Sequence, residues 1–256
     1  MPQDRTVLHN GRNLRIERVR SRPAPIEWSC VYATETQKFV LPMSDAGLDL
    51  RAHEQTWLVD GLTAMRLSSK LAYQLRAGTQ SVRESLVVSG DRPNTSDAEP
   101  AFWLLSTRAL FEIHLASRQE SGSTALAAAT SALVEQVSRG NALSPSTGAV
   151  ARARRLLVTA PGSFARASMH DIADASSVSP FHLARSFRRQ TGLSLHQYRQ
   201  RLRLAAVLAR LSHGERDLAG LAYDHGFCSQ SHLGALFQRE LGLTLGEARH
   251  ALARWA

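Results

Sequence analysis

Apolar and polar residues alternate in short segments across residues 27–117. Residues 48–50 (LDL) and 111–115 (FEIHL) are clear examples, with an apolar side chain at every second position. A period of two is typical of a half-buried antiparallel strand. Turn residues separate the segments, among them Asp60-Gly61 and a polar loop at 91–100. Many short strands at this spacing predict a sandwich or small barrel.

The pattern changes to a helical period at residues 123–139. Ser123 is placed to cap this helix. The period leaves two roles open: the helix packs on the sheet of its own domain, or it contacts a second copy of the chain in a dimer. The apolar stripe consists of Leu126, Ala129, Leu133 and Val137.

The segment that follows has the composition of a linker. Residues 140–148 (GNALSPSTG) contain Gly, Ser, Pro and Asn, and all later segments have the pattern of helices. We therefore predict a β-rich domain at 1–120, a helix at 121–140, a linker at 141–149 and an all-α domain at 150–256.

The all-α domain contains an internal repeat. A shift of 50 residues lays 179–195 (SPFHLARSFRRQTGLSL) over 229–245 (SQSHLGALFQRELGLTL). Eight of the 17 positions are identical, including the histidines, the phenylalanines and the glycines. A fixed period of this kind indicates one structural unit used twice.

The residues that begin and end the helices of the repeat predict a helix-turn-helix in each copy, at about 169–190 and 218–241. Gly192 and Gly242 end the second helix of each copy. A helix over 195–211 joins the two copies, and a helix over 149–160 precedes the first. The residues placed to cap the four helices are Ser168, Ser179, Asp217 and Ser229.

Charge is concentrated in the same domain. The 256-residue chain has a formal charge of +9, and residues 150–256 hold 15 Arg against seven acidic residues. Localised positive charge points to a polyanionic partner, either nucleic acid or an anionic membrane surface. Two cysteines exclude a disulfide framework, and the absence of an 18-residue apolar run or a leader-like N-terminus predicts a cytoplasmic protein.

The residues from 172 to 198, with their repeat from 221 to 248, resemble the AraC/XylS family of bacterial transcription regulators. The segment GFCSQSHLGALFQRELGLT in the second copy is the most diagnostic. Three positions depart from the pattern of the family. Ser177 stands where Gly is usual, Cys228 replaces a serine, and Gly220 lies inside a helix.

The resemblance implies a cupin-like or jelly-roll β domain that senses an effector and supports dimerisation. It also implies a DNA-binding regulator, an activator for example, that acts on promoter DNA and RNA polymerase. The sequence leaves open the effector, the operator, the oligomeric state and whether the regulator is an activator or a repressor. The alternative is a cupin-like enzyme with a DNA-binding appendage, but His53-Glu54 lacks the further histidines of a cupin metal site, so no metal, cofactor or catalytic residue is predicted.

The second helix of each unit is expected to enter the major groove. We predict that Arg185 pairs with guanine, that Phe181 packs on a thymine methyl, and that Arg188 and Arg189 contact phosphate. The second unit has Ala235 in the place of Arg185, so the first unit is expected to dominate sequence readout. The full set of predicted DNA-contacting residues is Phe181, Ala184, Arg185, Arg188, Arg189, Gln230, Ser231, Gln238 and Arg239.

Overall fold

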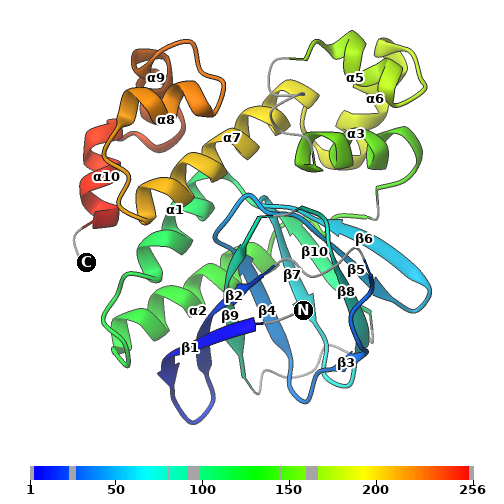
Figure 1. Ribbon diagram of the computed structural model, residues 1–256. Coiled ribbons are helices and arrows are strands. Elements are labelled where there is room, and N and C mark those ends of the chain that lie inside the picture. Colours follow the sequence, from blue (N-terminus) through cyan, green and yellow to red (C-terminus); the bar gives the residue numbers. More distant parts are fainter. Residues whose placement is uncertain are drawn as a thin grey trace.

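The computed structural model describes residues 3–22, 27–79, 81–90, 99–144, 146–159 and 167–253. Most of the predicted loop at 91–100 lies outside these residues. A β domain and a helical domain pack against each other, with the helical domain along one end of the sheets (Figure 1). The strands of the β domain are β1 (Gln3–Asn10), β2 (Arg15–Ser21), β3 (Tyr32–Ala33), β4 (Lys38–Pro42), β5 (Leu48–Ala52), β6 (Gln55–Val59), β7 (Thr63–Leu67), β8 (Ala72–Ala77), β9 (Arg83–Ser89) and β10 (Ala101–Leu104).

The strands form two antiparallel sheets with jelly-roll connectivity. One sheet has the order β1-β2-β9-β4-β7-β10 and the other has the order β3-β8-β5-β6. Without the outer strands β1 and β10, each sheet has four strands, and the chain crosses between the sheets at every step except the β5–β6 hairpin. This is the jelly-roll order, so the predicted class of the β domain is confirmed.

Residues 111–115 are helical, and the predicted strand there is wrong. They belong to helix α1 (Thr107–Ala116), which begins where the Ser106 hydroxyl accepts a hydrogen bond from the Ala109 N–H at 3.2 Å. A helix that is buried on several sides, as α1 is, also accommodates apolar residues at alternate positions, so a five-residue alternation does not separate a strand from a helix. The buried side chains of α1 are Thr107, Ala109, Leu110, Phe111, Ile113, His114 and Ala116.

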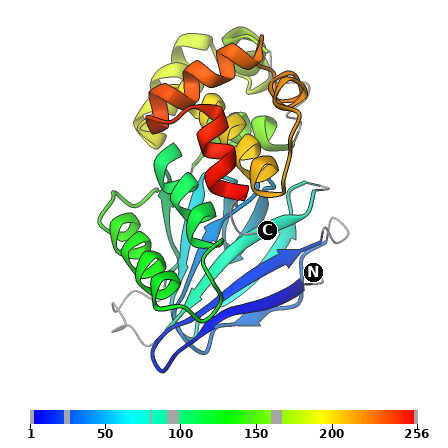
Figure 2. The ribbon, with the colours of Figure 1, turned by 90° about the vertical axis from the view of Figure 1, so that its left-hand side faces the viewer.

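Helix α2 (Thr124–Ser138) begins after Ser123, as predicted, with the Ser123 hydroxyl accepting from the Leu126 N–H at 3.1 Å. Leu126, Leu133 and Val137 are buried in the same core as the inner strands of the six-stranded sheet. The helix lies along that sheet (Figure 2). Its apolar stripe therefore packs on its own domain, and a dimer contact through other residues of α2 stays a prediction.

The helical domain agrees closely with the predicted pattern. The helix predicted at 149–160 is α3, and the connecting helix predicted at 195–211 is α7. The helices are α3 (Gly148–Thr159), α5 (Met169–Ala175), α6 (Pro180–Thr191), α7 (Leu195–Ser212), α8 (Leu218–Asp224), α9 (Gln230–Leu241) and α10 (Leu245–Ala253). Within the described ranges, none of the helices is long and apolar enough to cross a membrane.

The hydrophobic core does not stop at the domain boundary. One cluster of buried side chains, including Leu50, Val59 and Leu67, lies between the two sheets. A larger cluster begins on the other face of the six-stranded sheet, continues through α1 and α2, and runs into every described helix of the helical domain. The two domains therefore share buried apolar surface, which stabilises their relative placement.

Candidate nucleic-acid interface

The first helix-turn-helix unit consists of α5 and α6. Ser168 and Asp171 form a capping box at the start of α5, and the Ser179 hydroxyl accepts from the His182 N–H at 3.2 Å at the start of α6. Gly192, in the left-handed conformation with φ 74°, ends α6. Ser177 in the turn has a φ of 55°, a region that glycine occupies with less strain than serine.

The second unit, α8 and α9, repeats this construction with different residues. Ser229 caps α9, Gly242 ends it in the left-handed conformation, and Gly226 supplies the positive φ of the turn. The Asp217 carboxylate caps α8 by accepting from the N–H groups of Ala219 and Gly220. A Cβ at position 220 would lie 2.3 Å from Asp217 Oδ2, so the glycine inside this helix makes room for the cap.

The second helices, α6 and α9, bury equivalent residues. Leu183 and Phe187 of α6, like Leu233 and Phe237 of α9, are fully buried. The opposite faces are open to solvent, and Phe181 is 78% exposed, which is unusual for an aromatic side chain without a partner. The structure places all nine predicted DNA-contacting residues on these open faces: Phe181, Ala184, Arg185, Arg188, Arg189, Gln230, Ser231, Gln238 and Arg239.

Exposed arginines are distributed unequally between the two faces. Arg185, Arg188 and Arg189 of α6 form no ion pair within the described part of the chain. Arg239 of α9 instead contacts the carboxylate of Glu240 at 3.3 Å and Gln200 at 3.1 Å. The α6 face therefore offers more uncompensated positive charge to an anionic partner.

Two arginines that the sequence analysis missed hold the turns in place. Arg152 of α3 donates two hydrogen bonds to the Ser176 carbonyl, the closer at 2.7 Å, in the turn of the first unit. Arg203 of α7 donates to the Gly226 carbonyl, at 3.4 Å, in the turn of the second. Arg152 lies 24 residues before Ser176, and Arg203 lies 23 residues before Gly226. Because each arginine is on the helix before its unit, the repeat extends upstream of the compared segments.

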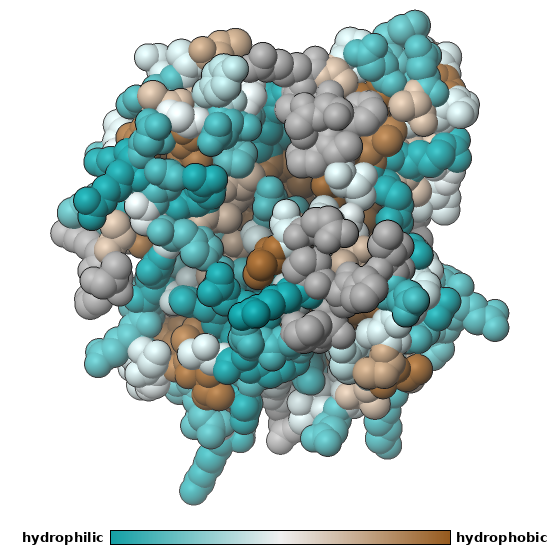
Figure 3. Space-filling view, in the orientation of Figure 1, coloured by the Kyte–Doolittle hydropathy of each residue, from teal (hydrophilic) through white to brown (hydrophobic). Residues whose placement is uncertain are grey.

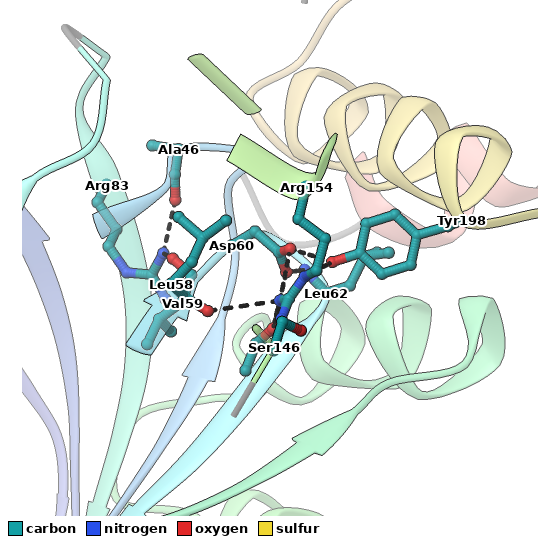
Figure 4. A network of polar contacts seen from close by, with 10 residues as sticks. Ala46, Leu58, Val59, Asp60, Leu62, Arg83, Ser146, Arg154 and Tyr198 are labelled. Atoms are coloured by element: carbon teal, nitrogen blue, oxygen red, sulfur yellow. Dashed lines mark hydrogen bonds and ion pairs between the residues drawn. The ribbon is translucent and has the colours of Figure 1, made fainter. Parts of the chain in front are cut away.

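A buried polar network joins α3 and α7, the helices on either side of the first unit, to the β domain (Figure 4). Asp60 lies in the turn between β6 and β7, and its Oδ2 accepts from Arg154 Nη2 of α3 at 3.0 Å. The Tyr198 hydroxyl of α7 donates to the same carboxylate, and Arg154 Nε lies 2.9 Å from the Tyr198 oxygen. Three elements far apart in the chain thus meet at one carboxylate.

The electrostatics of this network keep Asp60 ionised. Burial raises the pKa of Asp60, but the Arg154 charge and the hydrogen bonds from Tyr198 and Thr63 outweigh burial and lower the pKa below its ordinary value. Burial raises the pKa of the Tyr198 hydroxyl well above its usual value, so the group stays protonated and donates. The network is a buried ion pair with hydrogen bonds to both partners.

A second ion pair lies beside the first. Arg155 of α3 donates to both carboxylate oxygens of Asp49, at 3.0 and 2.6 Å, and Arg76 contacts Asp49 at 2.7 Å. The Asp49 side chain is almost completely buried, although its place in the alternating LDL pattern suggested an exposed position. Within the described residues, the side chains of Arg76 and Arg155 pair with this carboxylate in its buried position.

The second unit contacts the β domain directly through helix α1. Arg108 of α1 donates to the Leu241 carbonyl at 2.6 Å, at the end of α9. His213, at the end of α7, contacts the Glu84 carboxylate of β9 at 3.0 Å, and its side chain is about half exposed. Exposed ion pairs contribute little to stability, about 0–1 kcal/mol.

Among the described residues, no group of three or more His, Cys, Asp or Glu side chains is arranged to hold a metal ion. His114, predicted on a late strand, lies on α1, where burial lowers its pKa to about 4.

Hydrophilic side chains cover much of the face seen in Figure 3, and its apolar residues lie in scattered patches.

Comparison with known proteins supports the assignment of the helical domain. Residues 172–251 match a family described as a helix-turn-helix domain. The HTH-type transcriptional activator RhaS of Escherichia fergusonii is 34% identical over 100 residues, which cover 39% of this chain and 36% of RhaS. RhaS of Escherichia coli O157:H7 is 39% identical over 69 residues, covering 27% of this chain and 25% of the relative.

Residues 172–251 therefore form a helix-turn-helix domain, which agrees with the resemblance seen in the sequence. The chain spans only about a third of the length of the curated relatives that it matches. Those relatives are described as transcription activators.

Solved structures give more distant likenesses. ToxT from Vibrio cholerae is similar with 12% identity and a TM-score of 0.40, covering 94% of this chain and 100% of ToxT. A cupin superfamily protein from Desulfitobacterium hafniense has 7% identity and a TM-score of 0.30, covering 35% of this chain and 77% of that protein. The class of the β domain rests on its own strand order rather than on these likenesses.

Proposed function

We propose that this protein is a sequence-specific transcription regulator that inserts α6 and α9 into adjacent major-groove segments of promoter DNA. The observation that carries the proposal is the pair of equivalent helices with capped, glycine-terminated ends and open polar faces. A helix-turn-helix places its second helix in the major groove, with the first turns nearest the bases.

The charge of α6 supports different roles for the two helices in DNA binding. Arg185, in the second turn of α6, is positioned to pair with guanine, while Arg188 and Arg189 are placed one turn further for phosphate. In α9, Gln230 offers a bidentate partner for adenine, and Arg239 reaches only the backbone. The first unit then reads most of the sequence, and the second mainly anchors the protein.

The remaining parts of the proposal concern partners. As an activator, the protein contacts RNA polymerase at the promoter and works in the bacterial cytoplasm. The β domain binds an effector or a second protomer, and the shared core transmits that event to the helical domain. These roles follow from the resemblance to activators of this type and from the continuous packing between the domains.

Binding to promoter DNA at several salt concentrations tests the proposal. Neutralised phosphates release counterions, so the logarithm of the binding constant should fall linearly with the logarithm of salt concentration, with a slope of about −0.9 per phosphate. Replacing Arg188 and Arg189 with alanine removes about two phosphate contacts, so the slope should become shallower by about 1.8. Binding that is absent, or that does not change with salt, would contradict DNA recognition.

A further inference from the structure

A cleft of about 860 Å³ lies between the two domains, away from the recognition helices. Strands β2 and β9 and the end of α1 form one wall. The end of α7, the loop before α8, and α10 form the other. Helix α10 stands above the β1–β2 side of the large sheet in Figure 2.

Arginines from both domains line this cleft. The β domain contributes Arg18, Arg20 and Arg118, and the helical domain contributes Arg216 and Arg249. These five arginines face only two carboxylates, Glu84 and Glu215.

Both carboxylates already have partners. Glu84 contacts His213 at 3.0 Å and Arg18 at 3.7 Å. Glu215 pairs with Arg210, which is not part of the cleft, and accepts from the N–H groups of Arg216 and Asp217. Four of the cleft arginines therefore have no carboxylate partner among the described residues: Arg20, Arg118, Arg216 and Arg249.

The arginines without a carboxylate partner give the cleft an excess of positive charge. Burial and then the neighbouring Arg18 charge lower the pKa of the Arg118 guanidinium, with Glu84 opposing them, so there is a cost to holding this charge in the cleft. A bound anion removes that cost and accepts charge-assisted hydrogen bonds from the guanidinium groups. The cleft volume falls in the range of pockets that hold metabolites, about 300–1,000 Å³.

We propose that this cleft binds a small metabolite with at least two negative charges, carried by phosphate or carboxylate groups, that bridges Arg20 and Arg118 of the β domain to Arg216 and Arg249 of the helical domain. A ligand held by both walls favours the docked arrangement of the domains, because it loses half of its contacts when they separate. The regulatory meaning of the site rests on the proposed DNA-binding function, but anion binding itself does not.

Isothermal titration of the full chain with citrate and with pyrophosphate, in chloride buffer of constant ionic strength and without DNA, tests the site. Citrate reports a carboxylate ligand and pyrophosphate a phosphate ligand, and binding of either supports the proposal. The combined substitution Arg20→Ala and Arg216→Ala should weaken binding by about tenfold or more, since it removes one charged partner from each wall.

The matched control is Arg185→Ala with Arg188→Ala, which removes the same charge from the recognition helix. It should bind the probe as the natural chain does. Equal weakening in the control and in the cleft variant, or no binding of either probe at millimolar concentration, would overturn the proposal. Circular dichroism and thermal melting in chloride verify that each variant is folded.

The single variants test the bridge. Arg20→Ala and Arg216→Ala should each weaken binding of the probe that binds, because each wall contributes a cation. Weakening by only one of them would show an anion held on one domain and would overturn the bridging arrangement. DNA affinity is measured separately, so failure of anion binding and failure of DNA recognition remain distinguishable.

Discussion

The two helix-turn-helix units have the same construction but different surfaces. Both bury a leucine and a phenylalanine at equivalent positions, and both end their second helix at a left-handed glycine. They differ where side chains face solvent, because Arg185 of α6 corresponds to Ala235 of α9. The residues that pack inside each unit are repeated, whereas exposed residues of the second helices differ between the two copies.

The units also differ in how the β domain holds them. The helices that flank the first unit, α3 and α7, reach the buried Asp60 carboxylate through Arg154 and Tyr198. The second unit relies on α1 and on the half-exposed contact between His213 and Glu84. The ion pair on the side of the first unit is therefore the more deeply buried of the two, and α6 also carries more exposed arginines than α9.

The largest expected effect comes from breaking the attachment of the first unit. Asp60→Ala leaves Arg154 buried without a counter-charge, so we expect the free energy of unfolding to fall by about 3–5 kcal/mol. Glu84→Ala, the matching change at the second unit, should cost less, because the His213 and Arg18 side chains are partly exposed. Denaturant unfolding of the full chain measures both.

Two controls sharpen this result. The double variant Asp60→Ala with Arg154→Met should recover part of the loss, because it removes the unpaired charge. Asp4→Ala, which breaks an exposed pair with Arg22, should change stability by less than about 0.5 kcal/mol. If Asp4→Ala cost as much as Asp60→Ala, burial would not be the reason for the effect.

The next effect concerns DNA readout. Arg185→Ala should reduce discrimination between operator variants by about 1–3 kcal/mol, the range of a good bidentate contact with guanine. Gln230→Ala should reduce discrimination less, because α9 is expected to anchor rather than read. Affinities for a panel of single-base operator variants measure both changes. A larger loss of discrimination from Gln230→Ala would contradict the assignment.

The two turns offer a smaller, direct comparison. Ser177→Gly should stabilise the protein by about 0.5 kcal/mol, since relief of left-handed strain exceeds the extra chain entropy of glycine. Gly226→Ala should destabilise it by about 1 kcal/mol for the same steric reason. Thermal or denaturant unfolding of the two variants checks the opposite signs. Effects of the same sign would show that the turns are not equivalent.

The smallest effect depends on pH and belongs to the second unit. The hydrogen bond to Glu84 raises the pKa of His213, partly offset by burial, so this contact stabilises the fold below the ordinary histidine value of 6.5. Stability from His213 is then lost as pH rises through its raised pKa. Burial raises the pKa of Glu84, but His213 and Arg18 outweigh it and lower the pKa, so its contribution is lost at acid pH.

Melting temperatures of the natural chain and of His213→Gln across pH 5–9 measure this contribution. The difference between the two proteins should be largest near pH 5–6 and should shrink as the pH rises above 7. Buried His114 titrates in both proteins, so the comparison removes its effect. A difference that does not change with pH would exclude a charged contact between His213 and Glu84.

Local features of the helical domain were predictable because each depends on neighbouring residues. Capping by Ser179 or Ser229 requires only an N–H three residues away, and a glycine stop requires only a positive φ. The false strand at 111–115 shows the limit of local pattern. Helix α1 packs against the sheet and α7 and buries Phe111, Ile113 and His114, so burial there does not follow the alternation that suggested a strand.

Periodicity and short-range hydrogen bonding in the chain alone specified a β sandwich or small barrel, the repeated unit, the helix caps and the exposed face of each second helix, whereas the jelly-roll class was implied only by the family resemblance. The meeting of Asp60 with Arg154, 94 residues apart, and the gathering of arginines from both domains in one cleft depend on how the two domains dock. No local pattern encodes such contacts, because their energy exists only once distant surfaces have been brought together and shielded from water.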